Sequence, residues 1–193
     1  MNLPNKLTMV RIVLIPIFMF FYLANFVPYG KMIALAVFAI AAITDFFDGR
    51  IARKRNLVTN FGKFFDPLAD KLLVLSALAL VCIDHTVPVI MGAVVIMCIV
   101  GRDLVISGLR AIAASAGIII AADKWGKYKA FVIDIALVLL IVLAFINQYG
   151  FFGETAVFVY TIICWVVLCI GALLSVISCI NYMVKNREVF KDR

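Results

Sequence analysis

Residues 45–70 read DFFDGRIARKRNLVTNFGKFFDPLAD. Two pairs of aspartates, Asp45 with Asp48 and Asp66 with Asp70, stand on either side of a polar, basic segment at residues 54–61. Strongly apolar sequence leads up to the first pair and away from the second. This pattern predicts a helical hairpin that gathers four carboxylates at one end of two apolar helices.

The rest of the chain is also very apolar. Of its 193 residues, 66% are hydrophobic and 15% are charged. Soluble domains are nearer half apolar and a quarter charged, so the composition excludes an ordinary soluble fold and predicts an integral membrane protein. The net charge of +7 comes from basic residues in short segments between apolar runs. That placement indicates contact with anionic membrane lipids, and we expect no nucleic-acid partner.

Six apolar stretches are each long enough to cross a hydrocarbon core of about 30 Å as a helix. We predict spans at residues 8–27, 32–53, 64–83, 88–112, 128–147 and 156–183. Lysine and arginine gather at both termini and in the second and fourth links, which the positive-inside rule places in the cytoplasm. Residues 1–8 are expected to form a short interfacial segment. The prediction is an all-α, single-domain protein (residues 1–193) of the cytoplasmic membrane, with both termini inside.

The aspartates of the hairpin predict a metal site. Each charge within a span costs about 2.5–3.5 kcal/mol on insertion scales, and bound cations would offset that cost. Asp45 and Asp48 are three residues apart and Asp66 and Asp70 are four apart, so each pair shares a helix face. Carboxylate oxygens suit Mg²⁺ or Mn²⁺, and two such ions serve phosphoryl chemistry. The structural alternative is a set of salt bridges to neighbouring lysines and arginines.

Small residues and a proline shape the same hairpin. Gly49, Ala52 and Gly62 leave room for a ligand or a second helix to approach the aspartates closely. Pro67 either kinks the third span or lies at its start, with Asp66 as the cap. The first arrangement keeps Asp66 and Asp70 on one helix face, and the second weakens that expectation.

From Asp45 to Asp70 the residues spell D-x-x-D-G-x-x-A-R-x8-G-x-x-x-D-x-x-x-D. This pattern resembles the signature of the CDP-alcohol phosphotransferase family, with no departure at a defined position. The six-helix prediction is similar to that family's fold over the whole chain. Members join a CDP-activated lipid or CDP-alcohol to an alcohol acceptor and release CMP.

The resemblance implies a role for each residue of the signature. Two divalent cations, Mg²⁺ or Mn²⁺, would be held by Asp45, Asp48, Asp66 and Asp70. Asp70 would also be the catalytic base that deprotonates the acceptor hydroxyl. The cytidine nucleotide would be bound by Gly49, Ala52, Arg53, Gly62, Asn5 and Thr8.

Three further stretches resemble the bacterial branch of the family that takes glycerol 3-phosphate as its acceptor. They are residues 2–8 with Arg11, residues 101–110 and residues 126–129. The resemblance implies transfer of a phosphatidyl group from CDP-diacylglycerol to glycerol 3-phosphate. One departure is mild: the branch usually has Arg-Glu in the second stretch, where this chain has Arg102-Asp103.

Charged residues inside the fourth predicted span point to an acceptor site, because a charge within a membrane segment usually marks function. We expect Asp103 to neutralise either Arg102 or Arg110. The other arginine, with Lys127 or Lys129, would bind the acceptor phosphate, which the fork of a guanidinium matches well. The alternative is an Arg–Asp pair that only holds helices together.

Two rival functions stay open on the sequence. One is a sister enzyme with another acceptor, namely phosphatidylglycerol, serine or inositol phosphate. The other is a small cation transporter that uses the aspartates as its ion path. The expected partners are membrane lipids and a second copy of the chain. Tyr149, Trp165 and Tyr182 are predicted to be interfacial or packing aromatics.

Overall fold

The computed structural model describes residues 3–54, 60–115 and 125–187. Within these ranges, the side chains of residues 3, 4, 45–54, 60–64, 66, 115, 125 and 127 lie outside the description. The described chain is all-α. Its helices are α1 (Leu3–Leu23), α2 (Gly30–Lys54), α3 (Asn60–Ile83), α4 (Val89–Ser115), α5 (Trp125–Tyr149) and α6 (Glu154–Lys185).

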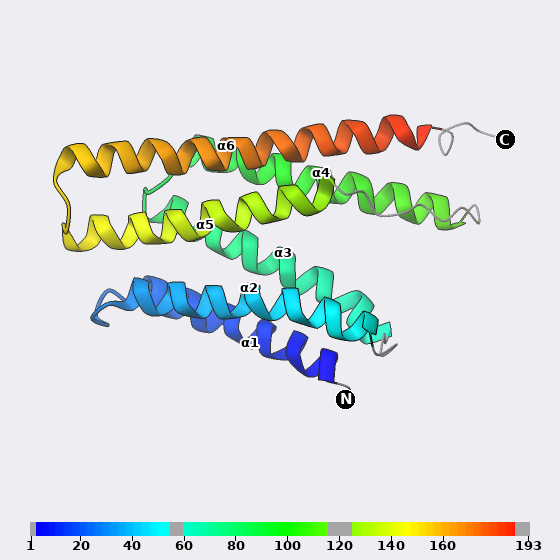
Figure 1. Ribbon diagram of the computed structural model, residues 1–193, viewed down its shortest axis with the longest axis horizontal. Helices are drawn as coiled ribbons and strands as arrows, with labels where there is room; N and C mark the ends of the chain where they lie inside the picture. The colour runs from blue at the N-terminus through cyan, green and yellow to red at the C-terminus, as the bar shows by residue number, and fades with distance from the viewer. Residues whose placement is uncertain (1–2, 55–59, 116–124, 188–193) are drawn as a thin grey trace.

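Successive helices run in opposite directions along one long bundle (Figure 1). The start of α1, the end of α2, the start of α3, the end of α4, the start of α5 and the end of α6 all lie toward the same end. We call this the hairpin end, and the opposite one the far end. The arrangement matches the hairpin expected from residues 45–70, since the four aspartates fall in the last turns of α2 and the first turns of α3.

The helices pack as two pairs with α3 between them. α1 packs along α2, and α5 packs along α6, while α3 contacts α1, α2, α4 and α5. The core is richest on α5, where Ile133, Leu137, Leu140 and Ile141 are essentially inaccessible. α5 therefore joins the two helix pairs, since it contacts α2 and α3 as well as α6.

Large apolar side chains cover much of the outer surface. Ile90 and Met97 on α4 and Phe158 and Leu173 on α6 are 82%, 73%, 65% and 61% exposed. Continuous apolar faces of this kind need an apolar solvent. Four described segments are long and apolar enough to cross a membrane, one each in α1, α4, α5 and α6, and α2 carries a shorter apolar run at Gly30–Thr44.

At the far end, α5 ends in a glycine cap. Gly150 has φ of +64°, and its N–H donates to the carbonyl of Ile146 at 2.9 Å. A left-handed glycine at this position satisfies a carbonyl at the end of a helix without the steric cost that other residues incur there. The cap turns the chain into the short link that leads to α6.

An ion pair between a buried lysine and a partly exposed aspartate lies at the far end. Lys31 Nζ lies 2.8 Å from Asp84 Oδ2 and donates to the carbonyl of Ala144 at 3.2 Å. The Thr86 hydroxyl donates to Asp84, and the Trp165 indole N–H donates to the Thr86 carbonyl at 3.0 Å. These contacts connect α2, α5 and α6 with the link between α3 and α4, and they lie far from the aspartate hairpin.

The predicted spans each overlap one helix, and the main correction concerns the first. The span was expected at residues 8–27, after a separate interfacial segment, but α1 is continuous from Leu3 to Leu23. Asn5 and Thr8 are 8% and 0% exposed, so these polar side chains are buried against other parts of the protein. Pro67 lies inside α3, well after its start at Asn60, which removes the arrangement in which Asp66 caps the helix.

Candidate active site between α3, α4 and α5

The aspartate hairpin supplies the first part of the candidate site. Asp45, Asp48, Gly49, Ala52 and Arg53 lie in the last turns of α2, and Gly62 and Asp66 lie in the first turns of α3. Their side chains lie outside the described residues, so the convergence of the four aspartates stays a prediction. Asp70 lies one turn after Asp66. Its side chain is among the described ones, and the residue is exposed.

Asp70 lines a cavity of about 90 Å³ between α3, α4 and α5. The side chains around it are mainly apolar, with a few charged groups, namely Asp70, Lys71, Asp103, Lys129 and Asp134. Such a site, mostly apolar with a few polar groups that converge, is typical of small-molecule binding. The structure therefore brings the predicted base into one cavity with Asp103 and Lys129, which come from two other helices.

Asp103 is the centre of a charged cluster at the wall of this cavity. Its Oδ1 lies 2.9 Å from Arg102 Nη1 and 3.2 Å from Lys129 Nζ. The side chains of Arg102, Asp103 and Lys129 are 15%, 16% and 7% exposed. The expected pairing of Asp103 with one arginine is present, and Lys129 shares the same carboxylate. Two cations thus surround one anion, which leaves this three-residue cluster with one net positive charge, while Asp70, Lys71 and Asp134 also line the cavity.

The guanidinium of Arg102 is held from three helices. Nη1 binds Asp103 on α4, and Nη2 donates to Ser178 Oγ on α6 at 3.0 Å. A Cβ added to Gly126, in the first turn of α5, would lie 2.7 Å from Nη2, so this glycine makes room for the guanidinium. Among the described residues, Arg102 Nε is buried without a hydrogen-bond acceptor. Arg102 itself does not line the cavity, so this nitrogen is a buried donor behind the wall formed by Asp103 and Lys129.

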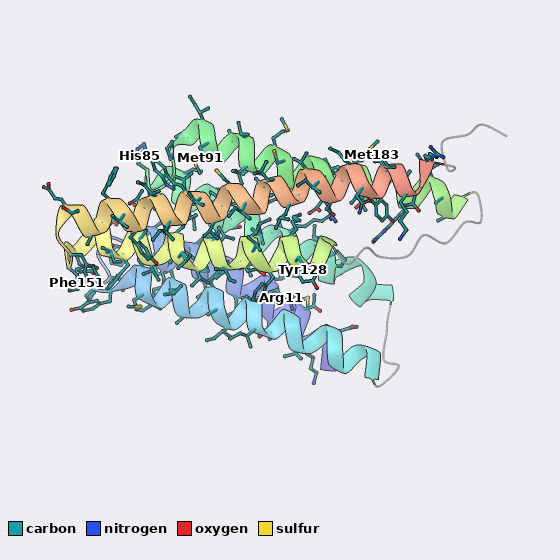
Figure 2. The ribbon with its side chains drawn as sticks, turned by 45° about the horizontal axis from the view of Figure 1, so that its top comes forward. Arg11, His85, Met91, Tyr128, Phe151 and Met183 are labelled. Carbon is teal, nitrogen blue, oxygen red and sulfur yellow. The ribbon has the colours of Figure 1, made fainter. Side chains whose placement is uncertain are left out.

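Arg110 lies two turns further along α4, toward the hairpin end, and does not line the cavity. Its Nε donates to the hydroxyl of Tyr182 on α6 at 3.0 Å, and its guanidinium carbon lies 5.6 Å from the centre of the Tyr182 ring. In Figure 2, His85 and Phe151 mark the far end. Met183, next to Tyr182 in the chain, and Tyr128, next to Lys129, both lie away from that end.

The last two predicted site residues with described side chains lie on α1. Asn5, Thr8 and Arg11 follow one another at a spacing of three residues, and all three are buried. The three residues share one face of α1. α1 contacts α2 and α3, the two helices that carry the signature aspartates. Lys127, predicted at the acceptor site, lies in the first turn of α5, and its side chain is outside the described residues.

Sequence reasoning missed the contribution of α6. Ser178 and Tyr182 each bind an arginine of α4. Tyr182 also packs against Ile106 and Leu109, as expected for a packing aromatic, but its bond to Arg110 was not predicted. Little in the sequence indicated this role. A serine and a tyrosine four residues apart are the only hint, and they stand in a long apolar segment. Lys129 was weighed only as an alternative to Lys127, and the structure places it directly at the cavity wall.

Comparison with known proteins assigns the family. The family model described as CDP-alcohol phosphatidyltransferase matches residues 1–176. The chain belongs to the CDP-alcohol phosphatidyltransferase family. This membership confirms the resemblance carried by the signature, and it covers all six helices at least in part.

Two of the named relatives in this family match over nearly the full length of both chains. A protein of Bacillus subtilis is 38% identical over 203 aligned residues, which cover 98% of this chain and 97% of the relative. A protein of Rickettsia felis is 35% identical, with the same coverage. A protein of Arabidopsis thaliana is 37% identical over 72% of this chain and 64% of its own length. All three carry the name CDP-diacylglycerol–glycerol-3-phosphate 3-phosphatidyltransferase, the third with the added number 2.

A CDP-alcohol phosphatidyltransferase generally depends on a divalent cation, and the donor set of this chain fits one. The signature supplies only carboxylate oxygens, which are ligands for hard cations such as Mg²⁺ and Mn²⁺. Among the side chains that the structure describes, no group of three His, Cys, Asp or Glu residues could hold a metal ion. Asp45, Asp48 and Asp66 are not among those side chains.

Proposed function

We propose that this chain transfers the phosphatidyl group of CDP-diacylglycerol to glycerol 3-phosphate, which gives phosphatidylglycerophosphate and CMP. The observation that carries the proposal is the cavity shared by Asp70 and Lys129. One wall offers a carboxylate that can accept a proton, and the other offers a buried cation that suits a phosphate. The names of the near full-length relatives agree with this pair of substrates.

The reaction requires that one bond form and another break at the same phosphorus. Asp70 accepts the proton of the sn-1 hydroxyl of glycerol 3-phosphate. The oxygen then attacks the β-phosphorus of CDP-diacylglycerol, which carries the diacylglycerol. The bond from that phosphorus to the bridging oxygen breaks, and CMP leaves with the bridging oxygen and its electron pair. Two divalent cations held by Asp45, Asp48, Asp66 and Asp70 would stabilise the negative charge on both phosphates.

The remaining side chains bind and orient the two substrates. Gly49, Ala52, Arg53 and Gly62 line the nucleotide pocket together with Asn5 and Thr8, whose buried face on α1 supports that role. The acceptor phosphate is bound by Arg102, Arg110 and Lys127, to which we add Lys129. The net positive charge of the Arg102–Asp103–Lys129 cluster supports this assignment, because glycerol 3-phosphate is an anion.

The same proposal includes the membrane arrangement. All six helices span the cytoplasmic membrane, both termini lie in the cytoplasm, and the hairpin end with its active site faces the cytoplasm. The bundle supports this topology, since the helix ends that border the lysine-rich and arginine-rich stretches, namely the end of α2 and the starts of α3 and α5, lie at the hairpin end. Residues 1–193 form one domain. The exposed apolar faces of α4 and α6 are covered by lipid or by the second copy of a homodimer.

The direct test is an acceptor panel on the purified protein. The assay contains CDP-diacylglycerol with glycerol 3-phosphate, phosphatidylglycerol, serine or inositol phosphate, and it measures CMP release. Release with glycerol 3-phosphate alone, lost with a chelator and restored by Mg²⁺ or Mn²⁺, supports the proposal. Release with another acceptor instead overturns the acceptor assignment and keeps the chemistry of the hairpin. If no acceptor releases CMP, cation transport in vesicles becomes the function to test.

A further inference from the structure

We infer that Ser178 and Tyr182 of α6 are positioning residues for the acceptor phosphate, acting through Arg102 and Arg110 of α4. The inference rests on the proposed function, since it assigns the two arginines to glycerol 3-phosphate. It goes beyond that function in giving α6 a defined part in acceptor affinity. No residue of α6 belongs to the signature or to the predicted site.

The first contact on which the inference rests is the one between Arg110 and Tyr182. Tyr182 is 2% exposed and packs with Ile106 and Leu109, so its ring is fixed between α4 and α6. Its hydroxyl accepts the Nε–H of Arg110 at 3.0 Å, and its ring lies under the guanidinium. A hydrogen bond at Nε fixes the plane of the guanidinium. The fork that then serves a phosphate is the one formed by the two η nitrogens.

The second contact fixes Arg102 in a similar way. Ser178 is fully buried, and its hydroxyl accepts from Nη2 of Arg102 at 3.0 Å. With Nη1 bound to Asp103, both η nitrogens of Arg102 are engaged, and Nε is the nitrogen left for a phosphate oxygen. The two arginines thus offer different nitrogens to a phosphate. Ser178 determines which nitrogen of Arg102 stays available, and Tyr182 determines which nitrogens of Arg110 do.

A positioning role differs in its consequences from simple helix packing. Ser175, three residues before Ser178 on α6, is also fully buried and also bonds α4, but it donates to the carbonyl of Cys98 at 3.2 Å. Tyr160, near the start of α6, donates its hydroxyl to the carbonyl of Leu139 at 3.3 Å. Neither residue contacts an arginine in these bonds. They are therefore matched controls for removing one hydroxyl group from α6.

The experiment compares five single variants by steady-state kinetics with CDP-diacylglycerol and glycerol 3-phosphate. Tyr182→Phe and Ser178→Ala should each raise the KM for glycerol 3-phosphate by about tenfold, the size expected when a hydrogen bond to a charged group is lost. The KM for CDP-diacylglycerol should stay unchanged. Tyr160→Phe and Ser175→Ala should leave both KM values unchanged. Ser178→Thr keeps a hydroxyl and should restore the acceptor KM.

A double-mutant test separates action through arginine from a direct effect. In an Arg110→Ala background, Tyr182→Phe should cause no further rise in the acceptor KM, because the side chain that it positions is gone. Independent, multiplying effects of the two changes would overturn the inference, as would a wild-type acceptor KM in Tyr182→Phe and Ser178→Ala. Equal rises in the control variants would also overturn it, since they would indicate general loosening of α6.

Failure of this inference is distinct from failure of the proposed function. Wild-type protein that releases CMP with glycerol 3-phosphate, while the Ser178 and Tyr182 variants match it, keeps the function and removes the role of α6. Wild-type protein that releases no CMP with glycerol 3-phosphate overturns both.

Discussion

Asp103 of α4 and Lys129 of α5 form an ion pair with 3.2 Å between Oδ1 and Nζ, at the wall of the cavity that Asp70 also lines. The same oxygen of Asp103 lies 2.9 Å from Arg102 Nη1. One carboxylate therefore holds two cations from two helices beside the predicted base. A buried charge cluster of this kind is costly to break, because the partners that remain are left without compensation.

Replacement of Asp103 by Asn should impair both stability and acceptor binding. The amide keeps the shape of the side chain but leaves Arg102 and Lys129 facing each other without an anion. We expect a lower thermal midpoint in detergent and a rise of about tenfold or more in the KM for glycerol 3-phosphate. Asp103→Glu keeps the charge and should stay close to wild type. An unchanged acceptor KM in Asp103→Asn would show that the cluster only joins helices.

Removal of the cation from Lys129 should weaken acceptor binding specifically. Lys129→Met keeps most of the apolar stem and should raise the KM for glycerol 3-phosphate by about tenfold to a hundredfold, with little change in the KM for CDP-diacylglycerol. Lys185→Met, in the last turn of α6, removes an exposed lysine and serves as the control. Equal effects of the two substitutions would point to general electrostatic attraction of the anion and would argue against a site at Lys129.

Asp70→Asn should abolish turnover while the protein stays folded. The amide cannot accept the proton of the acceptor hydroxyl, and it is a poor metal ligand. Asp70 is exposed at the cavity, so its loss should leave the thermal midpoint within a few degrees of wild type. The checks are CMP release and a melting curve on the same preparation. Retained turnover in a well-folded Asp70→Asn protein would contradict the assignment of the base.

At the far end, Asp84→Ala should destabilise the protein without altering its chemistry. Lys31, with a side chain 8% exposed, would lose its carboxylate partner and remain buried near the Ala144 carbonyl. We expect a loss of about 3 kcal/mol in stability, seen as a lower thermal midpoint. Both KM values and kcat of the folded fraction should match wild type. A changed acceptor KM would mean that the far end is coupled to the active site.

Much of the fold was predictable from the sequence, because the apolar runs are long and interrupted by polar links. The start of α1 was not, since the polar residues 1–8 were expected to form an interfacial segment, whereas α1 already begins at Leu3 and its Asn5 and Thr8 are buried inside the protein. The helical hairpin that carries the four aspartates was predictable because its spacing is local, and metal binding by it stays a prediction. Its side chains at Asp45, Asp48 and Asp66 stay a prediction.

Contacts between helices distant in sequence were the part that could not be predicted. Lys129 stands 26 residues from Asp103, Tyr182 stands 72 from Arg110, and Ser178 stands 76 from Arg102. Helical spacing relates residues within a turn or two and contains no information on which faces of two helices meet. The pairing of Asp103 with Arg102 was expected, and the partners supplied by α5 and α6 required the structure.

The most direct test of the central claim follows one oxygen atom. Glycerol 3-phosphate labelled with ¹⁸O at its sn-1 hydroxyl is incubated with CDP-diacylglycerol, a divalent cation and the purified protein, and the products are analysed by mass spectrometry. Transfer by attack on the β-phosphorus predicts that the label appears in phosphatidylglycerophosphate and that the CMP is unlabelled. Label in a cytidine-containing product joined to glycerol 3-phosphate, or unlabelled phosphatidic acid as the lipid product, would contradict the account.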